Sequence, residues 1–208
     1  MGKSLLVVES PTKVKTIKKY LGTDFIVMAS MGHVMDLPKK SLGIDMKNNF
    51  EPTYDVIDTR KKTVADIRAA AASAEKIYLA PDPDREGEAI AWHIANAIGK
   101  KGKGAYRVLF NDLTKKTILA AIANPLRLNY EKYEAQQTRR ILDRLVGYQI
   151  SPVLWDKVQK GLSAGRVQSV AVRIVCDREK EILNFKPEEY WNMLAQFEGP
   201  NPPPFGAK

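Results

Sequence analysis

The chain has 208 residues, 44% of them hydrophobic and 27% charged, which is typical of a soluble globular protein with one large or two small domains. Its net charge of +9 indicates a polyanionic partner, although charge alone does not separate DNA from RNA or from an acidic protein. No apolar run approaches a membrane span, no signal peptide is recognisable, and one cysteine excludes an internal disulfide. We therefore expect a cytoplasmic protein without a membrane partner.

Two stretches share one pattern, in which an apolar strand ends in acids and a helix follows. The run at residues 3–8 ends at Glu9, and Lys13 lies on the first turn of a helix predicted for residues 11–21. The run at residues 76–80 is followed by a cluster of four carboxylates and then a helix that ends near Gly99. These carboxylates belong to Asp82, Asp84, Glu86 and Glu88. Strand ends of this kind hold the ligands of α/β sheets.

The acidic cluster requires a compensating cation. Two carboxylates about 4 Å apart repel by roughly 4 kcal/mol at an effective dielectric constant near 20. The D-x-D-x-E spacing supplies hard oxygen ligands that suit Mg²⁺, and Arg85 among them indicates a phosphate shared with the metal. If the two strands are neighbours, Glu9 completes the site and Lys13 faces it. The alternative is a solvated acidic turn at a helix N-terminus, where acids are favoured in any case.

The other elements of the first 125 residues complete an α/β pattern. Further strands are predicted at 25–29 and 106–110, further helices at 63–74 and 113–123, and an irregular segment at 39–59. This order predicts an open, mostly parallel sheet with helices on its faces. Neither G-x-G-x-x-G nor a Walker A motif occurs, so nothing indicates ATP or a dinucleotide.

After residue 125 the pattern becomes helical. We predict a helix at 130–146 that Gly147 breaks, a second helix from Ser151, a long helix opened by the Gly/Ser turn at 163–165, and a strand at 188–197. Arg166 and Arg173 are seven residues apart on the long helix, whose N-terminus is either a phosphate site or an ordinary capped start. Cys176 is expected in the buried face of this helix.

Basic residues are concentrated in the second half of the chain. Most of them are expected in solvated loops and helix faces rather than in a binding site. The main contributors are Lys100, Lys101, Lys103, Arg107, Lys115 and Lys116.

Five motifs together resemble bacterial DNA topoisomerase I, the type IA class. They cover the whole chain in the family's order and lie at residues 8–13, 32–34, 82–93, 136–144 and 163–169. The resemblance implies a Rossmann-like Toprim domain over 1–125, followed by the start of a helical single-strand DNA-binding domain over 126–208. It also implies ATP-independent relaxation of negatively supercoiled DNA through a transient 5′-phosphotyrosine, by a monomer in the bacterial nucleoid.

The resemblance assigns roles to individual residues. Glu9, Asp82 and Asp84 would hold Mg²⁺, and Glu86 is the fourth acid of the Toprim site. Lys13 matches the lysine that contacts the scissile phosphate. The residues that match the DNA-binding surface are His33, Arg139, Arg140, Arg144, Gln149, Ser163, Ala164, Gly165, Arg166, Val167, Gln168 and Arg173.

The chain also departs from the family. None of its eight tyrosines has the sequence context of the family's nucleophile, and the zinc-binding cysteines are missing. We therefore expect the N-terminal part of a longer enzyme, inactive in cleavage by itself. Asp112 stands where the family usually has a glutamate and is not assigned to the site. Two alternatives remain, a metal-dependent Toprim nuclease and a DNA-binding module without catalysis.

Overall fold

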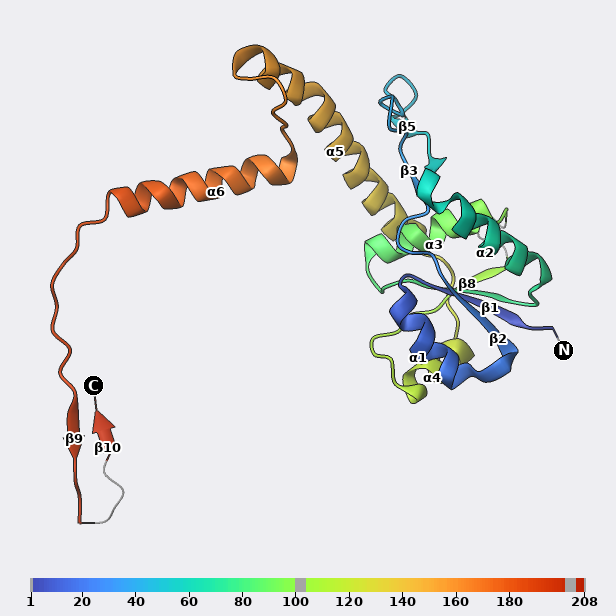
Figure 1. The fold of residues 1–208 in the computed structure, drawn as a ribbon, viewed down its shortest axis with the longest axis horizontal. Helices are drawn as coiled ribbons and strands as arrows, with labels where there is room; N and C mark the ends of the chain where they lie inside the picture. Colours follow the sequence, from blue (N-terminus) through green and yellow to red (C-terminus); the bar gives the residue numbers. More distant parts are fainter. Residues whose placement is uncertain (1, 100–103, 201–204, 208) are drawn as a thin grey trace. The chain divides into compact units, whose positions relative to one another are not determined.

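A computed structural model describes residues 2–99, 104–200 and 205–207 (Figure 1). The chain divides into two compact units, residues 1–165 and residues 166–208. Lys100, Lys101 and Lys103, which contribute to the basic surplus, lie outside the described residues, as does part of the proline-rich segment before the C-terminus.

A four-stranded parallel sheet forms the centre of the first unit, and it confirms the predicted α/β class. Its strands follow the order β2-β1-β7-β8. Their bounds are Ser4–Val8 for β1, Phe25–Ala29 for β2, Ile77–Ala80 for β7 and Ala105–Arg107 for β8. Residues 5–8 are fully buried because helices cover both faces of the sheet, which explains the unbroken apolar run.

Two pairs of helices cover the faces of the sheet (Figure 1). Helices α1 (Pro11–Leu21) and α4 (Lys115–Ala123) pack on the face that carries Leu6 and Val8. Helices α2 (Lys61–Ser73) and α3 (Arg85–Ala97) pack on the face that carries Leu5 and Val7. The chain crosses from β1 to β2 on one face and from β7 to β8 on the other. A topological switch point therefore lies between β1 and β7.

The segment predicted as irregular contains short antiparallel ladders. β3 (Met35–Asp36) pairs with β6 (Asp55–Val56), and β4 (Ile44–Asp45) pairs with β5 (Glu51–Pro52). The 3₁₀ turns η1 (Gly22–Asp24) and η2 (Asp58–Arg60) complete the connections. His33, before β3, contacts Glu86 of α3, and Asp36 of β3 contacts Arg140 of helix α5 (Tyr130–Lys157).

The predicted break at Gly147 is wrong. Helix α5 runs without interruption from Tyr130 to Lys157, through both Gly147 and Pro152. The turn that follows the helix packs back on it, because Ser151 Oγ accepts a hydrogen bond of 3.1 Å from the backbone of Ala164. Tertiary contacts of this kind offset the helix-breaking tendency of glycine, which is about 1 kcal/mol relative to alanine.

The second unit contains helix α6 (Arg166–Leu183) and a hairpin of β9 (Ala195–Phe197) and β10 (Phe205–Ala207). The strand predicted at 188–197 is therefore confined to its last three residues. The predicted burial of Cys176 is also wrong, since the residue is exposed and α6 has no buried residue in the part of the chain described. None of the described helices is long and apolar enough to cross a membrane.

Candidate active site

The two acidic strand ends meet at the switch point of the sheet. β1 pairs in parallel with β7, with Val8 opposite Ala80, so Glu9 and the loop that begins at Pro81 leave neighbouring strands at the same edge. The side chain of Lys13, from the first turn of α1, forms an ion pair with Asp82 across 69 residues of sequence. The condition on which the sequence-based site depended, adjacency of the two strands, is therefore met.

The start of α3 fixes the acidic loop. Asp84 is the N-cap, and its Oδ1 accepts a hydrogen bond of 2.7 Å from the backbone of Gly87. Gly87 is required by the space available, because a Cβ at this position would lie 2.0 Å from the carbonyl oxygen of Asp82. Asp82 itself is half exposed, so one carboxylate is used to form the helix start and the other remains accessible.

A buried ion pair supports the same loop from behind. The guanidinium of Arg107 lies 2.8 Å from Glu88, and the two residues are 1% and 3% exposed. Arg107 also donates hydrogen bonds to the carbonyl oxygens of Pro81, at 2.8 Å, and Asp82, at 2.6 Å. The expectation that basic residues of this region are mostly solvated is therefore wrong for Arg107, which is a structural part of the site.

The second oxygen of Glu88 connects the loop to α5. It accepts a hydrogen bond of 2.6 Å from the backbone of Asn129, which caps α5. The sequence gives only a weak signal for this network. The signal is that Arg107 ends a short strand and is followed directly by the apolar residues Val108 and Leu109. Glu88 is therefore a structural carboxylate, unlike its neighbours in the acidic cluster.

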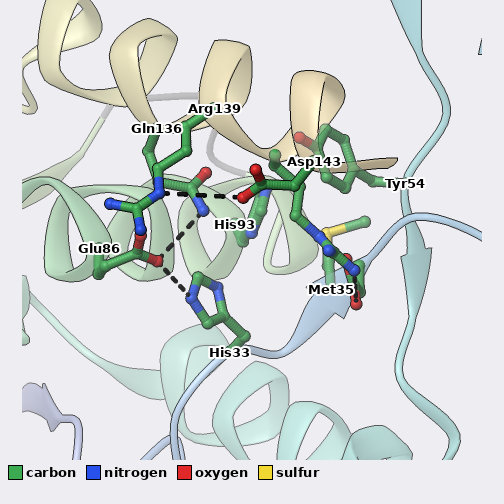
Figure 2. Close-up of a pocket in the computed structure, with 10 residues that line it drawn as sticks. His33, Met35, Tyr54, Glu86, His93, Gln136, Arg139 and Asp143 are labelled. Carbon is green, nitrogen blue, oxygen red and sulfur yellow. Dashed lines mark hydrogen bonds and ion pairs between the residues drawn. The ribbon is translucent and has the colours of Figure 1, made fainter. Parts of the chain in front are cut away.

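Glu86 faces a different cavity from the one at Lys13 (Figure 2). One of its oxygens lies 3.1 Å from His33 Nε2 and 3.2 Å from the amide nitrogen of Gln136, so the segment before β3, α3 and α5 converge on this carboxylate. The cavity has a volume of about 320 Å³ and is also lined by His93 and Arg139. On the other side of the acidic loop a cavity of about 300 Å³ is lined by Lys13, Asp82 and Asp112.

Burial shifts the ionisation of several groups around the Glu86 cavity. Desolvation, aided by the nearby His33, lowers the pKa of His93 to about 4. Desolvation also raises the pKa of Tyr133 to about 12 and raises that of Tyr54 further. For Asp36 burial acts to raise the pKa, but the hydrogen bonds from Arg140 and from the backbone of Leu37 outweigh it and lower the pKa.

His93 is expected to make the fold acid-sensitive by roughly 3 kcal/mol between pH 7 and pH 4. Its imidazole binds a proton near pH 6.5 in the unfolded chain but only near pH 4 in the folded chain, so protons favour unfolding throughout this interval. Urea unfolding at both pH values, for the wild type and for His93→Gln, measures the contribution. The variant should lose about 3 kcal/mol less stability; equal losses in the two proteins would contradict the prediction.

The arginines assigned to DNA are paired within the first unit. Arg140 donates two hydrogen bonds to the carboxylate of Asp36, at 2.9 and 2.8 Å. Arg144 is only 9% exposed and donates to the carbonyl of Pro38 at 2.8 Å, which gives it a structural contact on the segment after β3. Arg139 lies 3.9 Å from Asp143. Any contact of these groups with DNA requires them to share or exchange their present partners.

The remaining predicted contacts lie farther along the chain. Gln149 is exposed on α5, and Ser163 and Gly165 flank the buried Ala164 in the turn after that helix. The last group belongs to the second compact unit and consists of Arg166, Val167, Gln168 and Arg173, all exposed on α6.

The acidic residues fit a divalent metal by their chemistry. Among residues 2–99, 104–200 and 205–207, no three His, Cys, Asp or Glu side chains are arranged to hold a metal ion as they stand. Carboxylate oxygens are nevertheless the ligands that Mg²⁺ prefers, and the half-exposed Asp82 is paired with the ammonium of Lys13. A bound metal ion would replace the Lys13 ammonium as the partner of Asp82.

Comparison with known proteins identifies the family. Residues 4–113 match the Toprim domain and residues 127–204 match the DNA topoisomerase family. The chain belongs to the bacterial type IA DNA topoisomerases. The fold is similar to full-length topoisomerase I from Thermotoga maritima, with 46% sequence identity and a TM-score of 0.79. The match covers 93% of this topoisomerase chain and 32% of the Thermotoga protein, so the chain spans about a third of that length.

Family membership accounts for the main features of the site. The Toprim domain is in general a divalent-metal-binding domain, consistent with the oxygen ligands at the switch point. The boundary of the Toprim match falls after α3 and β8, whereas the first compact unit of this topoisomerase extends through α5 to residue 165. The long helix is therefore attached to the Toprim domain.

Proposed function

We propose that this chain supplies the Mg²⁺-binding acidic site and part of the single-strand DNA-binding surface of an enzyme that relaxes negatively supercoiled DNA without ATP. This enzyme would act in the bacterial nucleoid, and it would act as a monomer. The observation that carries the proposal is the ion pair between Lys13 and Asp82 at the switch point between β1 and β7, in a chain of the type IA family.

Each group at the switch point has a distinct role in this proposal. Glu9, Asp82 and Asp84 would hold Mg²⁺, whose charge helps to position a backbone phosphate. Lys13 stabilises negative charge on that phosphate, for which its ammonium is already directed at the acidic loop. Glu9, which follows β1, would sit near the sugar oxygen released by cleavage, as a metal ligand or as a proton donor.

Strand binding is assigned to the surface along α5 and beyond. His33, beside Glu86, and Arg139, at the rim of the same cavity, would contact the strand near the cleavage position. Arg140, Arg144, Gln149 and the segment 163–168 would hold the strand farther away, together with Arg173. Because these contacts are mainly to phosphates, removing one is expected to weaken affinity and reduce its salt dependence rather than change the chemistry.

The nucleophile of the reaction is proposed to come from outside this chain. Two transesterifications through a tyrosine conserve the energy of the phosphodiester bond, so ATP hydrolysis is unnecessary. None of the eight tyrosines here has the family's nucleophile context. Among them Tyr78 and Tyr133 are buried, which also removes them from contact with DNA.

Incubation of this chain with negatively supercoiled plasmid and Mg²⁺, followed by detergent, protease and gel electrophoresis, tests the proposal. We expect unchanged supercoils together with binding of a single-stranded oligonucleotide measured in parallel. Mg²⁺-dependent nicks would instead indicate that the acids activate water, as in a nuclease. A Glu9→Ala substitution in a complete enzyme distinguishes a catalytic site from a simple binding module. Relaxation should be lost if the acids are catalytic and should be unchanged if the domain only binds DNA.

A further inference from the structure

The cavity beside Glu86 contains more buried polar atoms than its own side chains satisfy. In the described part of the chain, both ring nitrogens of His93, the Oε1 of Gln136 and the hydroxyl of Tyr54 have no hydrogen-bond partner. All three residues line the cavity, and His93 and Gln136 are 2% and 6% exposed. Such atoms destabilise a protein by about 1–3 kcal/mol each unless a polar group reaches them. The cavity is thus suited to a ligand that carries both donors and acceptors.

The charges around this cavity do not favour a phosphate at its floor. With a pKa of about 4, His93 is uncharged at neutral pH. Three carboxylates and two guanidiniums line the walls, and the guanidinium of Arg140 is bound to one of these carboxylates. The five charged groups are Asp36, Glu86, Asp143, Arg139 and Arg140. A neutral polar ligand is therefore preferred over an anion.

We propose that the cavity receives the hydrogen-bonding edge of one unpaired nucleobase, with His93 and Gln136 as its contacts. This inference rests on the proposed function, because the bases of a bound single strand of DNA present such unpaired edges. A neutral imidazole offers one donor and one acceptor, and the amide oxygen adds an acceptor, which matches the mixed edges of bases. Tyr54, whose ring lies 4.7 Å from that of His93, provides an aromatic wall.

Shape and position agree with this assignment. The volume of about 320 Å³ lies within the range of roughly 300–1,000 Å³ for ligand pockets. Figure 2 shows His33 and Gln136 both directed at Glu86, with His93 between them and the Tyr54 side of the cavity. A base held here would therefore be anchored beside the acidic loop and would fix the register of its strand.

Imidazole NMR tests the site directly, because the chain contains only two histidines. His93→Phe assigns the two sets of signals. We expect the His93 signals to move on addition of 2′-deoxynucleosides and to stay in place on addition of inorganic phosphate. Movement with phosphate alone, or no movement with either probe, would overturn the inference. The measurement does not depend on strand binding and so stands apart from the proposed function.

A binding cycle then locates the base. His93→Phe keeps an aromatic ring against Tyr54 and Tyr133 but removes both nitrogens. The probes are oligonucleotides in which a single abasic site is moved along the sequence. At one position the abasic site should weaken binding to the wild type about fivefold to tenfold. At the same position it should leave the affinity of His93→Phe unchanged. Equal losses in both proteins at every position would refute the contact.

Two controls make the cycle interpretable. His93→Gln keeps a donor and an acceptor, so it should restore binding, whereas a role in packing alone would favour phenylalanine over glutamine. Unfolding curves of both variants establish that they are folded. If the wild type binds no oligonucleotide while deoxynucleosides still move the His93 signals, the proposed function fails and the base site is supported.

Discussion

Replacement of Arg107 by alanine is expected to lower the free energy of unfolding by about 3–5 kcal/mol. The substitution leaves Glu88 charged, 3% exposed and without its cation, and it removes the donors from the carbonyl oxygens of Pro81 and Asp82. Because those carbonyls belong to the acidic loop, the Mg²⁺ binding proposed for this loop should weaken as well. Urea unfolding and calorimetric Mg²⁺ titration measure the two effects.

A surface arginine provides the matched control. Arg127 is exposed three residues before the start of α5, and its replacement by alanine should change stability by no more than about 0.5 kcal/mol. Arg107→Lys keeps the charge but loses the planar set of donors, so an intermediate result is expected. A loss below about 1 kcal/mol for Arg107→Ala would show that the pair contributes little and that the loop is held by other contacts.

Substitution of Gly87 by alanine is expected to destabilise the protein by about 1–3 kcal/mol and to disrupt the acidic loop. The added Cβ would lie 2.0 Å from the carbonyl oxygen of Asp82, a backbone atom that no rotamer change can move. Either the loop or the first turn of α3 has to shift, and both Asp82 and Asp84 move with it. Thermal unfolding and Mg²⁺ titration are the measurements.

Gly147 is a suitable control because it is also a helical glycine. A Cβ at this position meets only the carbonyl oxygen of Ala164, at 3.7 Å, which is ordinary contact. Gly147→Ala should therefore be neutral or stabilise α5 by up to about 1 kcal/mol. If both substitutions had the same effect on stability and on Mg²⁺ binding, the close approach at Gly87 would not be the cause.

The strand-then-acid pattern was sufficient to predict the sheet and its acidic edge. The runs that end at Glu9 and before Asp82 are buried on both faces, so their hydrophobicity is continuous and their ends are marked by the first polar residues. Helix α3 is likewise confirmed, because its apolar spacing and its N-cap at Asp84 are local features. The roles of the DNA-binding residues stay predictions.

The errors arose where distant residues decide the outcome. Arg107 and Glu88 are 19 residues apart, and Arg140 and Asp36 are 104 apart, so no local pattern reveals that these charges are paired. Gly147 suggested a helix break, yet the turn at Ala164 packs against α5 and keeps it continuous. His93 and Gln136 were missed as a pair, since burial without a partner is visible only in three dimensions.

The attachments of α5 also determine which parts of the enzyme can move. Glu88 binds the backbone of Asn129 at the N-cap, Glu86 binds Gln136, and Asp36 binds Arg140, so the first three turns of α5 are held at three points. These ties couple the N-terminal part of the long helix to the acidic loop and to the segment at β3. We therefore expect the backbone amides of α5 up to Arg140 to share the hydrogen-exchange protection of the sheet, since freeing them requires these ties to break.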